Sequence, residues 1–171
     1  MNVILSTDRL RLKEFTLNDH AFIIELLNSP GWLKYIGDRN VKSVEDAENY
    51  LSSGPIKSYA ENGFGLSLVE TNEGTPIGMC GLIQRKEFKV PDIGFAFLPE
   101  YVGKGYAYEI SNALMNYARE QLKLTEILAI TLEANRKSIR LLERIGLSFK
   151  ERYISPNSQE ELLLYSTIIS N

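Results

Sequence analysis

Residues 94–107 read GFAFLPEYVGKGYA and combine the end of a strand, a loop with two glycines and the start of a helix. The first N–H groups of a helix have no partner inside it, and the helix dipole is positive at that end. Glycines at positions 103 and 105 let an anion approach the backbone closely. Two interpretations of this segment alone stay open, a phosphate-binding loop and an ordinary tight turn.

Two familiar phosphate loops are excluded by the spacing of this segment. A Walker loop needs Ser or Thr directly after Gly-Lys, but Gly105 follows Lys104. A dinucleotide-binding fingerprint needs a third glycine near Tyr108, and none is there. A phosphate bound at this loop would therefore need a different fold around it.

The apolar pattern predicts further elements on both sides of the loop. Downstream it predicts a long helix after Gly105, a strand over 126–132, a helix from Asn135 to Gly146, and strands over 149–154 and 162–168. Upstream it predicts strands over 10–15, 64–71, 77–84 and 91–98.

Two helices are expected between the first two strands. Asn18-Asp19 can cap the first helix, which should end near Asn28 because Pro30-Gly31 follows. Ser43 begins a capping box for the second helix, with Asp46 where Glu or Gln is usual. Gly54-Pro55 should stop or kink that second helix.

The order of these elements indicates the fold class. Three successive strands favour antiparallel pairing, whereas the strand-helix-strand unit from Asp92 to Leu132 favours a parallel neighbour. We therefore expect an α/β (α+β) fold, with a mixed, mostly antiparallel twisted sheet of about seven strands and flanking helices.

Composition restricts the class of protein further. The 171 residues suit one domain over 1–171, and the net charge of −3 argues against a nucleic-acid partner. A single cysteine, Cys80, and a single histidine, His20, predict neither a disulfide nor a metal site. No signal peptide or membrane span is apparent, so a cytoplasmic protein with no membrane partner is expected.

A second segment, residues 135–147, reads NRKSIRLLERIGL and follows a predicted strand about thirty residues after the glycine loop. Together the two segments resemble the acetyl-CoA site of the GNAT superfamily of N-acetyltransferases. The resemblance extends over essentially the whole chain and includes TDRLRL at 7–12 and Ile77-Gly78. It is greatest to the RimJ/RimL-like branch, which acetylates protein N-termini and has relatives that use other amines.

The resemblance implies acetyl-CoA as cosubstrate and a set of residues that bind it. The pantetheine arm would pair with backbone groups near Ala96 and Phe97. The diphosphate would lie on the amides of Val102, Gly103, Lys104, Gly105, Tyr106 and Ala107. Val102 departs from the Arg or Gln usual before the first glycine, so a side-chain contact to phosphate is missing. Asn135 has two compatible interpretations, a helix cap and a contact to the cofactor arm.

The same resemblance identifies candidates for the chemistry. Many members protonate the departing thiolate with a tyrosine, but that position is Leu142 here. Ser138 matches a serine that, in the RimL-like branch, is thought to hydrogen-bond the sulfur; otherwise it is a plain residue of the first helical turn. Asp92 and Glu133 are the candidate bases, and a solvated charge at a strand end is the alternative for each.

Three functional hypotheses remain. The first is acetylation of a peptide or protein N-terminal α-amine, because an α-amine with pKa about 8 needs less help from a base than a lysine amine with pKa about 10.4. The second is acetylation of a small-molecule amine such as an antibiotic, polyamine or amino acid. The third is a non-catalytic acyl-CoA-binding module. The protein is expected to be a monomer or a homodimer.

Overall fold

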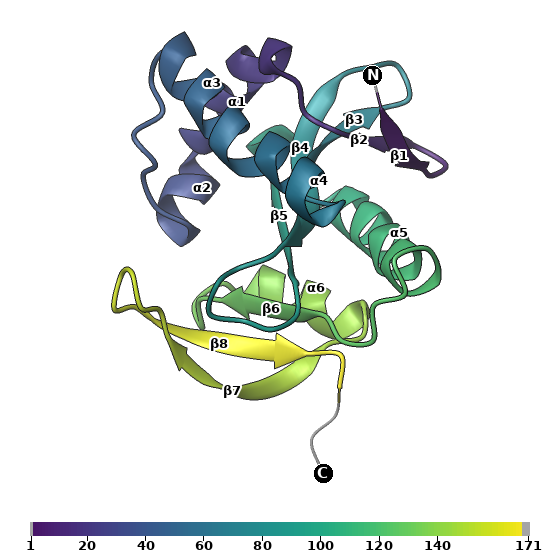
Figure 1. Ribbon diagram of the computed structural model, residues 1–171, viewed down its shortest axis with the longest axis vertical. Coiled ribbons are helices and arrows are strands. Elements are labelled where there is room, and N and C mark those ends of the chain that lie inside the picture. Colours follow the sequence, from purple (N-terminus) through teal and green to yellow (C-terminus); the bar gives the residue numbers. More distant parts are fainter. Residues whose placement is uncertain (1, 169–171) are drawn as a thin grey trace.

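The computed structural model describes residues 2–168, which form one eight-stranded sheet with helices on both faces (Figure 1). The strand order is β1-β2-β3-β4-β5-β6-β8-β7, and every neighbouring pair is antiparallel except β5 and β6. The strands are β1 (Val3–Ser6), β2 (Leu10–Lys13), β3 (Leu66–Thr71), β4 (Pro76–Ile83), β5 (Asp92–Phe97), β6 (Leu128–Thr131), β7 (Ser148–Ile154) and β8 (Glu161–Ser166). This confirms the predicted fold class, and β1 is one strand more than expected.

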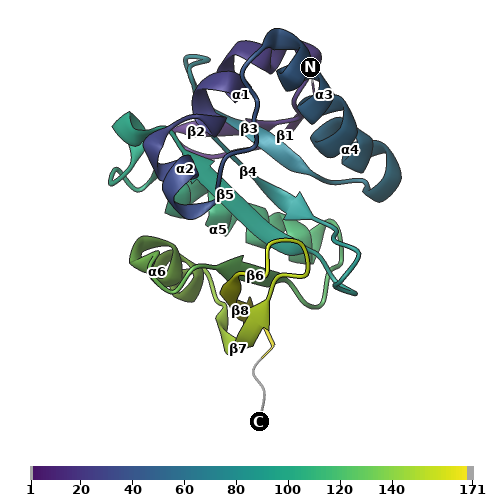
Figure 2. The same ribbon diagram turned by 90° about the vertical axis from the view of Figure 1, so that its left-hand side faces the viewer.

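The helices divide between the two faces of the sheet. Figure 2 shows α1 to α4 over one side of the central strands and α5 on the other. Their bounds are α1 (His20–Leu27), α2 (Pro30–Tyr35), α3 (Val44–Leu51), α4 (Lys57–Asn62), α5 (Tyr106–Glu120) and α6 (Arg136–Arg144). Each face has its own apolar core, because Leu68 packs with α1 and α3 whereas the next residue, Val69, packs with α5.

Local side-chain chemistry explains where the first helices begin. Ser43 and Asp46 form the predicted capping box. Asp19 is the N-cap residue of α1, within the expected Asn18-Asp19 pair, but its side chain makes no capping hydrogen bond to that helix. Instead Asp19 forms a capping box with Thr16 at the preceding 3-10 turn, Leu17–Asp19. The first helix ends at Leu27, before Pro30-Gly31, as predicted, but Pro30 is also the first residue of a further helix, α2, that was not predicted. Proline suits that position, since the N–H it lacks would have no partner there.

The predicted kink at Gly54-Pro55 is a π-helical segment, Ser52–Ile56, that joins α3 to α4. Pro55 cannot donate a backbone hydrogen bond and its ring occupies the space of the preceding turn, so the helix widens instead of continuing as a regular α-helix. Pro55 is itself buried. The helical layer over β3 and β4 therefore bends but does not end at this point.

The sheet is nearly divided between β5 and β6. Among the described residues their only paired positions are Asp92 and Leu128, whereas β4 and β5 pair over six. Side chains from both halves nevertheless share the core around α5, from Leu12 and Ile93 on one side to Ala129 and Tyr165 on the other. The two halves are thus held together by apolar packing rather than by a continuous hydrogen-bond ladder.

Candidate active site

The divergence of β5 from β6 leaves a free backbone edge along β5. Leu128 donates its N–H to the Pro91 carbonyl at 3.0 Å, and residues 94–97 beyond this point are half-buried. On the other edge of β5, Leu98 donates to Ile77 at 3.0 Å. Backbone groups alternate along an antiparallel ladder, so those of Phe95 and Phe97 face the free edge.

This register distinguishes the two residues predicted to pair with the pantetheine arm. Phe97 lies with its backbone groups toward the free edge, open to an extended partner. Ala96 is opposite Met79 and turns its backbone groups toward β4. Phe95, which sequence reasoning did not single out, occupies the equivalent place one step back along the strand. The sequence signal for Phe95 was that backbone groups of successive strand residues point to alternate edges. That signal identifies Phe95 only once the register between β4 and β5 is known.

The glycine loop continues directly from β5. A short 3-10 turn, Pro99–Tyr101, is followed by the loop and then by α5. Gly103 and Gly105 both have φ of +82°, in the left-handed region that favours glycine. The first N–H bonded within α5 is that of Glu109, which donates to the Gly105 carbonyl at 3.0 Å, so the amides before it have no partner inside the helix.

The space around this loop suits an anion. A Cβ built on Gly103 would meet no atom within 4 Å, so a ligand can reach its backbone. Val102 is 45% exposed and contributes no charge. The Lys104 ammonium lies 5.7 Å from the centre of the Tyr101 ring. Unpaired amides, the positive end of the helix dipole and this lysine all favour negative charge, so the residues fit the phosphates of a coenzyme A thioester.

The beginning of α6 follows β6, on the opposite side of the divergence. Asn135 Oδ1 accepts a hydrogen bond from the Ser138 N–H at 3.3 Å, which confirms the predicted helix cap. Both residues are half-buried. Between residues 2 and 168, no partner is found for the Ser138 hydroxyl, so it is available to a ligand.

Asp92 lies at the point where β5 and β6 meet. Its side chain is only 2% exposed, and Oδ1 accepts a hydrogen bond from Arg85 Nε at 2.9 Å. Burial raises the pKa of the Asp92 carboxyl, while the Arg85 guanidinium opposes that rise; the net direction is upward. Asp92 is thus a carboxylate of increased basicity at the closed end of the divergence.

Glu133 has the opposite environment. Its side chain is 58% exposed, and it accepts hydrogen bonds from Arg152 at 3.2 and 3.3 Å. These hydrogen bonds, together with the charge of Arg152, lower the pKa of Glu133. Arg152 also pairs with Glu161 at 3.0 Å. The two predicted bases are therefore different groups in different settings, and neither arginine partner was found from the sequence.

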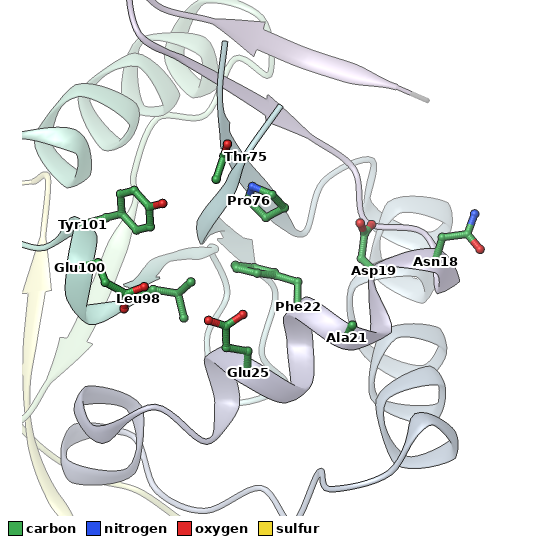
Figure 3. Close-up of a pocket in the computed structure, with 10 residues that line it drawn as sticks. All are labelled: Asn18, Asp19, Ala21, Phe22, Glu25, Thr75, Pro76, Leu98, Glu100 and Tyr101. Atoms are coloured by element: carbon green, nitrogen blue, oxygen red, sulfur yellow. The ribbon is translucent and has the colours of Figure 1, made fainter. Parts of the chain in front are cut away.

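Two cavities lie near the loop but apart from the free edge of β5. The first, of about 480 Å³, lies between α1 and the segment that follows β5. Figure 3 shows the carboxylates of Glu25 and Glu100 on either side of Leu98, with the Phe22 ring close by. None of the residues predicted to bind the cofactor lines this cavity. The second, of about 510 Å³, lies between the β1–β2 turn and α5, and its lining includes Gly105.

Residues 2–168 contain neither a candidate membrane-spanning helix nor a cluster of metal ligands. No helix there is both long enough and apolar enough to cross a membrane. No three His, Cys, Asp or Glu side chains in that range gather as ligands for a metal ion.

Comparison with known proteins gives consistent matches. The family described as "Acetyltransferase (GNAT) domain" matches residues 9–148. An uncharacterised N-acetyltransferase of Bacillus subtilis (strain 168), YoaA, is 30% identical over 147 residues, which cover 84% of this chain and 81% of YoaA.

Two solved structures resemble the fold closely. RimL, a ribosomal L7/L12 α-N-protein acetyltransferase in complex with coenzyme A, superposes with a TM-score of 0.83 at 15% identity and 98% coverage of both chains. Spermidine N-acetyltransferase from Vibrio cholerae, in complex with CoA and spermine, gives a TM-score of 0.76 at 21% identity, with 94% of this chain and 95% of that chain covered.

Proposed function

Since the chain belongs to the GNAT family of N-acetyltransferases, we propose that it moves the acetyl group of acetyl-CoA to the α-amine of a peptide or protein N-terminus. One observation carries the choice of site. The backbone edge that β6 leaves unpaired on β5 runs directly into the glycine loop. An extended pantetheine arm that ends in phosphates fits an unpaired strand edge followed by a phosphate-binding loop.

The donor is bound mainly by the backbone in this proposal. The amides from Gly103 to Ala107 hold the diphosphate in this proposal. The Val102 N–H, which the sequence also suggested, already donates to the Pro99 carbonyl at 3.3 Å, and no particular side chain is required at position 102. The free groups of Phe95 and Phe97 pair with the pantetheine arm, as an added strand would. Asn135 contacts the arm from the α6 side while it caps that helix.

Two groups act at the thioester. A backbone N–H on the free edge of β5 donates to the carbonyl oxygen as that atom gains negative charge, which is the function of an oxyanion hole. The unpartnered hydroxyl of Ser138 donates to the departing sulfur. A serine hydroxyl is a weak acid, so its contribution is a hydrogen bond rather than a complete proton transfer.

Asp92 is the base that we favour. Burial raises its pKa, and it lies where β5 and β6 meet, at the closed end of the proposed binding edge. Because its side chain is almost completely covered, it takes the amine proton through a water molecule. Glu133 is less suited, since Arg152 holds its pKa below the usual range.

The choice of an α-amine as acceptor follows from this limited basicity. An α-amine is partly neutral near pH 7, whereas a lysine or polyamine amine is almost entirely protonated there. The buried carboxylate of Asp92 is therefore a sufficient base for an α-amine. RimL, whose fold this chain shares, acts on a protein α-amine.

A small amine is the second candidate acceptor, and one observation favours it. The cavity of about 480 Å³ presents Asp19, Glu25 and Glu100 beside the Phe22 ring, a lining that suits a cation. Spermidine N-acetyltransferase has the same fold. A third possibility, a silent acyl-CoA-binding module, predicts binding without turnover.

A thermal melt with acetyl-CoA, paired with a thiol-release assay, tests these alternatives. Acetyl-CoA at about one hundred times its dissociation constant should raise the free energy of unfolding by about 2.7 kcal/mol. For a chain of this length that raises Tm by roughly 5–10 °C. Thiol release on peptides with free N-termini, and none on the same peptides with blocked N-termini, is expected. Release only on polyamines would favour the second acceptor, and a shift without release on any amine would favour the silent module.

A further inference from the structure

The turn between β1 and β2 contacts the start of α5, about a hundred residues away in the chain. Thr7 donates its hydroxyl to Glu109 Oε1 at 2.7 Å, and the Arg9 N–H donates to the same oxygen at 3.0 Å. Arg9 Nε lies 2.7 Å from Glu109 Oε2. Both carboxylate oxygens in the first turn of α5 are thus held by this distant turn.

Arg9 also contacts the glycine loop itself. Its Nη1 donates to the Lys104 carbonyl at 3.1 Å, and its guanidinium carbon lies 4.4 Å from the centre of the Tyr106 ring. A Cβ built on Gly105 would come within 3.3 Å of Arg9 Nη2. One side chain therefore touches the loop, the first residue of α5 and the first helical turn.

This arrangement also affects the charge near the loop. Glu109 places a carboxylate in the first turn of α5, close to the amides that we propose for the diphosphate. Alone, that negative charge would weaken binding of an anion. The positive charge of Arg9 compensates the negative charge of Glu109. Because the guanidinium is bound to Glu109 and to the Lys104 carbonyl, it does not occupy the side of the loop on which we place the diphosphate.

We propose that Arg9 is a positioning residue that fixes the glycine loop and the first turn of α5 in the shape that receives the diphosphate of acetyl-CoA. This inference rests on the proposed function. Arg9 acts through the backbone of Lys104 and the carboxylate of Glu109, not as a direct ligand of the phosphates. Neither its place in the β1–β2 turn nor its distance along the chain suggests such an effect on the cosubstrate.

The test compares two acetyl donors, acetyl-CoA and S-acetylpantetheine, which carries the same thioester but no diphosphate. Arg9→Ala is expected to raise KM for acetyl-CoA about tenfold with little change in kcat, and to leave kcat/KM for S-acetylpantetheine unchanged. A loss of folded protein would lower the apparent kcat/KM for both donors by the same factor. The ratio of the two kcat/KM values therefore isolates the effect on the glycine loop. Arg119→Ala is the control, because Arg119 lies in the last turn of the same helix and, within residues 2–168, hydrogen-bonds only to Asn116.

Glu109→Gln distinguishes a positioning residue from a direct phosphate ligand. It removes a negative charge that would by itself disfavour an anion, so a rise in KM for acetyl-CoA can come only from the lost anchor of Arg9. That rise is expected, and the double variant should be little worse than either single one. If Arg9 bound phosphate directly, Glu109→Gln would strengthen acetyl-CoA binding, which would overturn the inference.

Two other outcomes separate this inference from the proposed function. If Arg9→Ala keeps the wild-type ratio of kcat/KM for acetyl-CoA to kcat/KM for S-acetylpantetheine, the role of Arg9 is overturned and the proposed function is not affected. Wild-type protein that neither binds nor uses either donor would overturn the proposed function, and the role of Arg9 with it. If Arg9→Ala does not fold, Arg9→Lys keeps the charge but not the bridge, and should show the same selective rise in KM to a smaller degree.

Discussion

Arg85 Nε lies 2.9 Å from Asp92 Oδ1, so a side chain that is 33% exposed reaches a carboxylate that is 2% exposed. The two residues lie at opposite ends of the loop between β4 and β5. The loop thereby places the positive charge of Arg85 beside Asp92, where β5 and β6 diverge. Burial raises the pKa of the Asp92 carboxyl that we propose as the base, and this pair limits that rise.

Arg85→Ala should move the acid limb of the pH–rate profile to higher pH. Arg85 opposes the rise that burial causes in the pKa of Asp92, so its removal raises that pKa further, and the ionised base forms only at higher pH. A shift of about 1 pH unit in the profile of kcat/KM is expected. Arg85→Lys, which keeps the charge, should shift the limb less. An acid limb that stays in place in Arg85→Ala would contradict a role for Asp92 as base.

Ser138→Ala should lower kcat and leave the affinity for acetyl-CoA unchanged. The hydroxyl has no protein partner within residues 2–168, so its loss costs little stability, whereas loss of a hydrogen bond to a charged sulfur costs about 1.5–3 kcal/mol, which is roughly tenfold or more in rate. Single-turnover rates and a binding titration measure the two effects separately. Ser148→Ala, at an exposed position of β7, is the control. Equal turnover in Ser138→Ala and wild type would disprove the role of the hydroxyl.

Gly103→Ala and Gly63→Ala should have similar effects on stability and different effects on binding. The φ values are +82° and +79°, and an added Cβ meets nothing within 4 Å at either site. Each substitution should therefore cost about 1–2 kcal/mol through the left-handed backbone. Only Gly103 lies in the loop that we propose for the diphosphate, so only its variant should lose affinity for acetyl-CoA in a melt titration. Equal affinities in the two variants would count against that loop.

Gly81→Ala should destabilise the fold strongly, whereas Gly31→Ala should not. A Cβ at Gly81 would lie 2.5 Å from the Leu66 Cα in the neighbouring strand, and backbone cannot move aside as a side chain can. A loss of at least about 1–3 kcal/mol is expected in urea unfolding. Gly31 lies in the first turn of α2 with open space around it, and alanine there should add about 0.4–1 kcal/mol. Similar midpoints for both variants would refute this account of the strand packing.

Cys80 should not react with thiol reagents in the folded protein. Burial raises the pKa of its thiol to about 12, so almost no thiolate is present near neutral pH, and the side chain is fully covered. A colorimetric thiol assay should count no protein thiol until denaturant is added. Rapid labelling of the native protein would show that the region between β4 and α5 opens readily.

The sequence predicted the fold because its elements are strongly periodic and clearly punctuated. Gly103 and Gly105 mark the turn before α5, and the glycines lie where the structure requires positive φ. The strand Val3–Ser6 was missed because four residues at a sheet edge give too short a pattern to recognise. Helix α2 was missed because the proline that follows one helix can also begin the next, and only the following residues decide whether it does.

The details of the site depend on contacts that no local pattern encodes. Whether Ala96 or Phe95 turns its backbone to the free edge depends on the ladder register, and a shift of one residue reverses the answer. The partners of Asp92 and Glu133 come from a loop and from another strand. Both arginines lower the pKa of their carboxylate, but burial outweighs Arg85 and raises the pKa of Asp92, whereas exposed Glu133 keeps the lowering by Arg152. Residue type alone cannot distinguish these two outcomes.

The single pair that joins β5 to β6 also has a kinetic consequence. Backbone groups on the free edge of β5 are not engaged with another strand, so a ligand that lies along them breaks no existing ladder when it arrives. The association rate is then governed by diffusion and orientation rather than by a slow opening of the protein. Because the core around α5 fixes the two halves of the sheet, the unpaired edge of β5 is already formed before any ligand binds.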